Sequence, residues 1–96
     1  MIVRIPGLLR SYTAGAAMVE VTAGATKPDA SRGASVDSVL MELDRRFPGL
    51  RFRIIDEQAA VRPHIKLFVD GLLVRDLAHP VHAAAELMIV GALSGG

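Results

Sequence analysis

Few residues in this 96-residue chain have the types and spacing that catalysis or metal binding requires. Cysteine is absent, which excludes disulfides, thiolate metal sites and a cysteine nucleophile. His79 and His82 lie on either side of Pro80 in a predicted loop, and two histidines are too few to hold a metal ion. The sequence also lacks a phosphate-binding glycine motif and a nucleophile elbow. We therefore expect a protein that is not an enzyme and that binds no metal or cofactor.

The C-terminal end offers a different kind of chemistry. The last residues are Ala92-Leu93-Ser94-Gly95-Gly96, which follow a predicted strand. Because glycine has no Cβ, the main chain at Gly95 and Gly96 can pass through a narrow channel and bring a bare carboxylate to a reactive centre. An extended tail of six residues reaches about 20 Å. We expect the α-carboxylate of Gly96 to be the functional group. Leu93, Ser94 and Gly95 would be the tail residues that pass through the partner's channel.

Composition predicts one globular domain over residues 1–90 and a flexible tail over residues 91–96. Hydrophobic residues make up 51% of the chain and charged residues 22%, enough for a single core. A net charge of +1 and 4% aromatic residues give no basis for nucleic-acid binding. No apolar run reaches the roughly 18 residues of a membrane span, and Arg4 and Pro6 interrupt any signal peptide. We expect a cytoplasmic protein that is a monomer when free.

The elements that must position the tail follow from the spacing of apolar residues. One stripe at helical spacing predicts a helix from Ser35, its N-cap, to Phe47. The stripe consists of Val36, Val39, Leu40, Leu43 and Phe47. Apolar runs predict strands over residues 2–5, 17–21, 50–55, 65–69, 72–74 and 86–90. Asp70 and Gly71 predict a hairpin turn, and residues 22–34 and 77–85 are expected to be loops.

This order of elements predicts an α+β fold of the ubiquitin-like β-grasp type. A mixed sheet would pack on one main helix, with the first and last strands side by side in its middle. Alternation along two strands points five side chains toward the helix: Ile65, Leu67, Val69, Leu87 and Ile89. Phe68, Met88 and Val90 then point away from the helix. An exposed apolar patch of this kind indicates a partner-binding surface, although scattered exposed apolar side chains are also common.

Several segments of the sequence match the pattern of one known family. They are Ile5-Pro6 with Leu9-Arg10, the predicted helix 35–47, the run from Ile65 to Gly71, and above all the terminal Ala92-Leu93-Ser94-Gly95-Gly96. On these residues the chain resembles the MoaD/ThiS family of ubiquitin-like sulfur carriers over nearly its whole length. It departs from the family in a longer 22–34 loop. It also has Ala83-Ala84-Ala85-Glu86 where the family often has a Gly-Asp turn.

The resemblance implies that the protein is a substrate of other enzymes. An E1-like enzyme would adenylate the carboxylate of Gly96 with ATP, and a persulfide or sulfide would then displace AMP and leave a thiocarboxylate. That nucleophile would donate sulfur to an acceptor synthase that makes molybdopterin, thiazole, cysteine or another metabolite. Two other functions stay open. One is a ubiquitin-like modifier joined to lysines, and the other is a non-covalent binding module that uses Phe68, Met88 and Val90.

Overall fold

The computed structural model describes residues 1–21, 34–82 and 84–91. Its helices and strands are β1 (Ile2–Arg4), the 3₁₀ helix η1 (Gly7–Thr13), β2 (Met18–Glu20), β3 (Ala34–Ser35), α1 (Val36–Arg46), α2 (Leu50–Ile54), β4 (Ile65–Val69), β5 (Leu72–Val74), β6 (Pro80–Val81) and β7 (Glu86–Gly91). Five strands form one sheet in the order β2-β1-β7-β4-β5, and β3 pairs with β6 in a second, two-stranded sheet.

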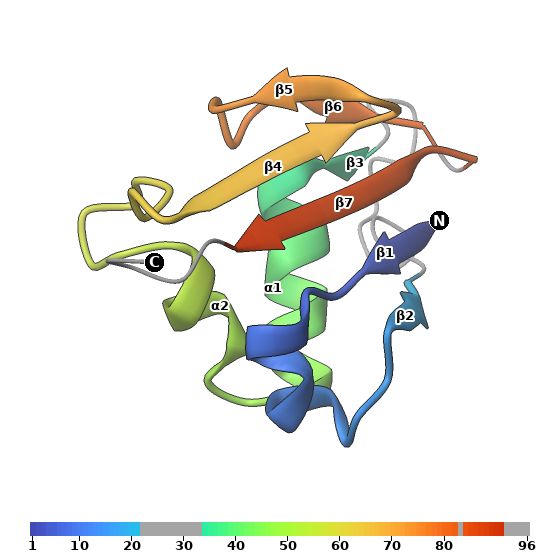
Figure 1. Cartoon of the computed structure of the whole chain (residues 1–96). Coiled ribbons are helices and arrows are strands. Elements are labelled where there is room, and N and C mark those ends of the chain that lie inside the picture. The colour runs from blue at the N-terminus through green and yellow to red at the C-terminus, as the bar shows by residue number, and fades with distance from the viewer. Residues whose placement is uncertain (22–33, 83, 92–96) are drawn as a thin grey trace.

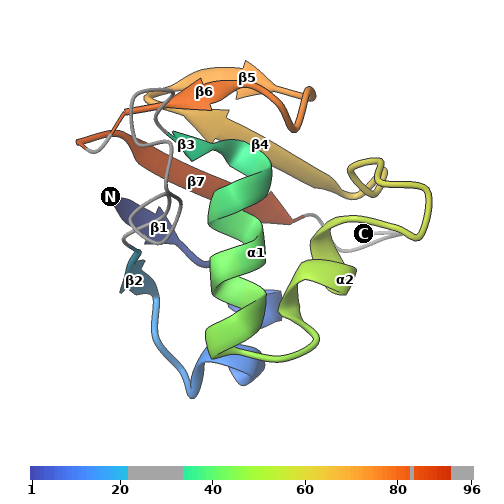
Figure 2. The same cartoon turned by 180° about the vertical axis from the view of Figure 1, so that it is seen from behind.

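The five-stranded sheet is mixed, and its first and last strands meet in the middle. β1 runs parallel to β7, with Val3 opposite Leu87, whereas the other strand pairs are antiparallel. Helix α1 lies across one face of this sheet (Figures 1 and 2). The predicted α+β fold, the ubiquitin-like β-grasp, is therefore confirmed.

Local chemistry explains where α1 begins and ends. The Ser35 and Ser38 side chains form a capping box: each accepts a hydrogen bond from the backbone N–H of the other. Asp37 lies in the first turn and two arginines lie in the last, as the helix dipole favours. The apolar stripe of α1 faces the sheet, and Val36, Val39, Leu40 and Leu43 are fully buried. The predicted helix and its Ser35 cap are confirmed.

The strand predicted over residues 50–55 is wrong, because Leu50–Ile54 forms helix α2. Leu50 and Ile54 are four residues apart and both fully buried, a spacing that suits one helix face as well as an alternating strand. An Asp44 Oδ1 atom accepts hydrogen bonds from the N–H groups of Gly49 and Arg51, at 3.0 and 3.2 Å. These bonds satisfy N–H groups at the start of α2 and so favour the helix.

Two other segments contain elements that the sequence analysis does not predict. Between the first two predicted strands lies η1, in which Leu9 and Thr13 are buried. The predicted 77–85 loop contains β6, which pairs with β3 through Ala34 opposite Val81. Within the described residues, no helix is both long and apolar enough to cross a membrane. Most of the predicted 22–34 loop lies outside the described residues.

Candidate functional site

One row of side chains runs across all five strands on the face of the sheet that points away from α1. The pairing register places Met18 opposite Arg4, Arg4 opposite Met88, Met88 opposite Phe68, and Phe68 opposite Leu73. Facing side chains on adjacent strands lie close enough to touch. Four of the five members are apolar, so the row forms a nearly continuous apolar band.

Val90 extends this band, because it lies two residues beyond Met88 on β7 and opposite Lys66 on β4. We call Met18, Phe68, Leu73, Met88 and Val90 the outer apolar face. Met18 is 54% exposed, Leu73 42%, Val90 38% and Met88 37%, while Phe68 is half-buried. By contrast Leu67, Leu87 and Ile89, at the alternate positions of the same strands, are buried against the helix. The predicted sides of Phe68, Met88 and Val90 are therefore correct.

Charged side chains interrupt and border the outer apolar face. Arg4 lies within the row and forms a salt bridge with Glu86, with 3.0 Å between Arg4 Nε and Glu86 Oε2. Lys66 and Glu20 are exposed next to Val90 and Met18 respectively. An apolar centre with mixed charges at its margin is the composition of a protein-binding surface rather than of a catalytic pocket. In the described part of the chain, no three His, Asp or Glu side chains come close enough together to hold a metal ion.

Met18 and Leu73 are members of this face that the sequence analysis did not identify. For Leu73 a signal was present, because a two-residue turn at Asp70 and Gly71 places residue 73 opposite Phe68. Met18 could not be placed without the pairing of β2 with β1.

Comparison with solved structures finds this fold in several small proteins. A chain of the Amycolatopsis orientalis BexX/CysO complex is 28% identical, with a TM-score of 0.81. The match covers 99% of this chain and 98% of that one. CysO of Mycobacterium tuberculosis (22% identity, TM-score 0.78) matches over 96% of this chain and 98% of its own. SAMP1 of Haloferax volcanii is 24% identical with a TM-score of 0.78, and the match covers 100% of this chain and 98% of SAMP1. The resemblance to the MoaD/ThiS-like sulfur carriers is confirmed. No protein-family model and no curated protein matches the sequence.

β7 is the strand that leads to the predicted tail. It is the middle strand of the five, and it ends at Gly91, opposite Ile65 of β4. A Cβ atom on residue 91 would lie 2.3 Å from Leu8 Cδ2 and 3.1 Å from Leu8 Cγ, so glycine allows η1 to pack on the end of β7. The tail residues predicted to act, Leu93, Ser94, Gly95 and Gly96, lie outside the described residues.

The other end of β7 is held by a carboxylate. Asp70, in the β4–β5 turn, accepts a hydrogen bond from the Glu86 N–H at 2.9 Å, and its second oxygen lies 3.1 Å from His82 Nε2. The Glu86 N–H bond, followed by the His82 side chain, holds the pKa of Asp70 below its ordinary value. Both ends of the strand that leads to the tail are thus fixed, one by packing and one by hydrogen bonds.

Proposed function

We propose that this protein is a sulfur carrier whose C-terminal carboxylate, at Gly96, is converted to a thiocarboxylate by an E1-like enzyme. The observation that carries the proposal is the 28% identity to a chain of the BexX/CysO complex over nearly the full length of both chains. The position of β7 also supports it, because a strand fixed in the middle of the sheet gives the tail a rigid base. In this role the chain is a substrate and has no active site of its own.

The proposed chemistry needs two steps at one carbon atom. First, a carboxylate oxygen of Gly96 attacks the α-phosphate of ATP, and pyrophosphate leaves. Second, hydrosulfide attacks the carbonyl carbon of the acyl-adenylate, the bond to AMP breaks, and the resulting thioacid loses its proton. The thiocarboxylate sulfur is then the nucleophile that an acceptor synthase consumes. ATP binds to the activating enzyme, so this chain needs no cofactor.

The outer apolar face is the part of the described structure best suited to hold the activating enzyme and the acceptor synthase. Phe68, Met88 and Val90 supply apolar contact area, and Met18 and Leu73 widen it across the sheet. Methionine side chains adapt to different surfaces, which suits a protein that must bind two partners in turn. The BexX/CysO crystal structure is of a two-protein complex, which supports a partner-binding role for a similar chain.

The test incubates the full chain with ATP, sulfide and an E1-like adenylating enzyme, and measures intact mass. We expect a mass gain equal to the exchange of one oxygen for one sulfur, located in the C-terminal peptide. Deleting Gly96 should abolish the gain, because the carboxylate retreats by about 3.5 Å from the adenylating centre. Adding a residue after Gly96 should abolish it too. Sulfur uptake by both altered chains at the wild-type rate would place the reactive group elsewhere.

Two other results would favour the alternatives. Isopeptide bonds between Gly96 and lysines of other proteins, without transfer of sulfur to a metabolite, would favour a ubiquitin-like modifier. Binding to the enzyme through Phe68 with no adenylation of any form of the chain would favour a non-covalent binding module.

A further inference from the structure

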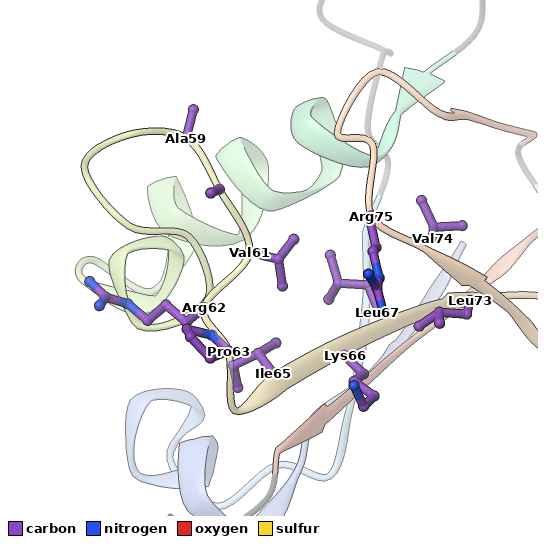
Figure 3. Close-up of a pocket in the computed structure, with 11 residues that line it drawn as sticks. Ala59, Val61, Arg62, Pro63, Ile65, Lys66, Leu67, Leu73, Val74 and Arg75 are labelled. Carbon is purple, nitrogen blue, oxygen red and sulfur yellow. The ribbon is translucent and has the colours of Figure 1, made fainter.

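A pocket with a volume of about 500 Å³ opens at the edge of the main sheet, where β5 leaves β4 (Figure 3). Its floor is β4, and its two walls are the loop before β4 and the end of β5. Figure 3 shows Val61 directed from the loop into the space between the loop and β4. The apolar part of the lining also includes Leu67 and Val74, which are nearly fully buried, and the exposed Leu73. The pocket therefore borders the hydrophobic core at Leu67 and Val74.

The loop that forms one wall is held in place from within. Asp56 Oδ1 accepts hydrogen bonds from the N–H groups of Gln58 and Ala60, at 2.8 and 3.1 Å. Ile55 and Val61 form an isolated antiparallel bridge, and Ala59 has a left-handed φ of 62°. A non-glycine residue keeps such a backbone only where its surroundings stabilise it. The wall of the pocket is thus preformed and does not need a ligand to order it.

The floor of the pocket carries a backbone acceptor at an open strand edge. β5 pairs with β4 only from Leu67, opposite Val74, to Val69, opposite Leu72. In a hairpin with a two-residue turn, Leu67 and Val69 are the β4 residues that exchange backbone hydrogen bonds with β5. Ile65 lies two residues before Leu67, so its N–H and C=O groups point to the edge of β4 on which β5 lies. The Ile65 N–H donates to Arg62 O at 2.9 Å. The Ile65 carbonyl lies past the end of β5, and no backbone N–H of residues 1–21, 34–82 or 84–91 outside the strand ladders donates to it. Among these residues it is thus an acceptor for an added strand.

Among the described residues, the charged side chains that line the pocket are all cationic, and they are Arg62, Lys66 and Arg75. The Asp56 carboxylate of the loop wall instead accepts hydrogen bonds from N–H groups within the loop. Figure 3 shows the Arg62 side chain extending away from the pocket, where its Nε donates to Phe52 O at 2.7 Å. Lys66, which follows Ile65 on β4, lies on the outer side of the sheet. Arg62 and Lys66 therefore do not fill the apolar centre, and Figure 3 shows the Arg75 side chain beside Leu67.

We propose that this pocket binds an extended peptide segment of a partner protein, in which an apolar side chain is flanked by carboxylates. The apolar side chain would fill the space beside Val61 and Leu67, a backbone N–H would donate to the Ile65 carbonyl, and a carboxylate would pair with Arg75. Such strand addition is a known way for a sheet edge to bind a peptide. This site lies at the sheet edge and shares only Leu73 with the outer apolar face. It does not depend on the chemistry of the tail.

The test is a titration of the ¹⁵N-labelled full chain, followed by amide NMR, with the acetylated and amidated tetrapeptide Glu-Val-Leu-Glu. We expect saturable shifts confined to residues around Val61, Ile65 and Val74, with a Kd on the order of 1 mM. The matched peptide Lys-Val-Leu-Lys should bind at least about tenfold more weakly. Arg75→Glu should remove the preference for the acidic peptide. Arg45→Glu makes the same charge change on α1, outside the pocket lining, and should keep the preference.

Four results would overturn the proposal. They are an absence of saturable shifts, equal affinity for the two peptides, an unchanged preference in Arg75→Glu, or shifts centred on Phe68 and Met88. Shifts at the pocket that depend on protein concentration without peptide would mean that a second copy of this chain occupies it. Circular dichroism of Arg75→Glu checks folding, and Arg75→Lys, which keeps the charge, should retain the preference for the acidic peptide.

Discussion

The two faces of the main sheet are built from the same strands but have opposite roles. On β7, Leu87 and Ile89 point to α1 and are almost completely buried, whereas Met88 and Val90 point away and keep more than a third of their surface exposed. On β4 the same alternation separates buried Leu67 from half-buried Phe68. Hydrophobicity alone does not distinguish the two sets, because both are apolar. They differ only in whether the side chain points toward α1 or away from it.

This difference shows which apolar residues the fold needs and which are available for partners. A side chain packed on all sides loses both its transfer free energy and its contacts when it is truncated. A side chain on the outer apolar face is already in contact with water, so its truncation costs the folded chain little. Its apolar surface would be buried only in a complex. Neighbouring positions of one strand therefore allow a direct test.

The largest expected effect is on stability, from truncation of the inner face. Leu87→Ala should lower the free energy of unfolding by about 2–5 kcal/mol, since Leu87 is fully buried between the sheet and α1. Leu43→Ala, on the helix side of the same core, should cost a similar amount. The matched change Met88→Ala should cost less than about 1 kcal/mol. Urea denaturation measures all three, and equal losses for Leu87→Ala and Met88→Ala would remove the distinction between the faces.

The next effect is on binding, from a charge placed on the outer face. Phe68→Asp should weaken binding to the E1-like enzyme by about 30-fold or more, the range of an interface hot spot. The variant should stay folded, because Phe68 is only half-buried. Leu67→Asp, one residue earlier on the same strand, should unfold the protein. Isothermal titration calorimetry and thermal melting separate the two outcomes, and unfolding of Phe68→Asp would assign Phe68 to the core.

Much of the fold could be predicted because its strongest signals are local. The α1 stripe, the Ser35 cap and the turn at Asp70 and Gly71 are each encoded within a few residues. Both turn residues have positive φ, 50° and 86°, as this two-residue hairpin requires. Helix α2 escaped prediction because an alternating pattern and a four-residue helical spacing coincide over five residues. What favours the helix is Asp44, several positions away.

The candidate site could be predicted only where one strand is enough to define it. The outward phase of Phe68, Met88 and Val90 follows from alternation within β4 and β7. Met18 joins them only through the pairing of β2 with β1. The edge pocket depends on where β5 ends and on the loop wall at Val61, and neither has a local sequence signature. Features that depend on strand register or on how a loop closes can be identified only from the three-dimensional structure.

A smaller effect is expected at the end of β7, where the inner core meets η1. Gly91→Ala should destabilise the chain by about 1–3 kcal/mol, because the new methyl group overlaps Leu8. Removing the obstacle should restore stability, so the double variant with Leu8→Ala should lose less than the sum of the two single changes. A double-mutant cycle by urea denaturation measures this coupling. Strict additivity would show that Leu8 moves aside freely and that glycine is not needed there.

The smallest expected effect is a pH dependence at the opposite end of β7. The pKa of Asp70 is lowered from its ordinary value of 3.8, first by the Glu86 N–H and then by His82. A carboxyl group whose pKa is lower in the folded state stabilises the protein above its unfolded pKa. That contribution is lost as the pH falls through the folded pKa. Wild-type stability should therefore decline more steeply between about pH 5 and pH 2 than that of Asp70→Asn.

Asp70→Asn is a suitable comparison because an asparagine oxygen can still accept the Glu86 N–H and tolerates the left-handed φ of residue 70. The readout is the slope of unfolding free energy against pH, not its absolute value, since an Asn-Gly turn has its own preference for the hairpin. Glu57→Gln, which removes one exposed carboxylate from the loop before β4, is the matched control for the loss of a carboxylate. Parallel slopes for wild type and Asp70→Asn would mean that Asp70 holds β7 no more tightly when charged than when neutral.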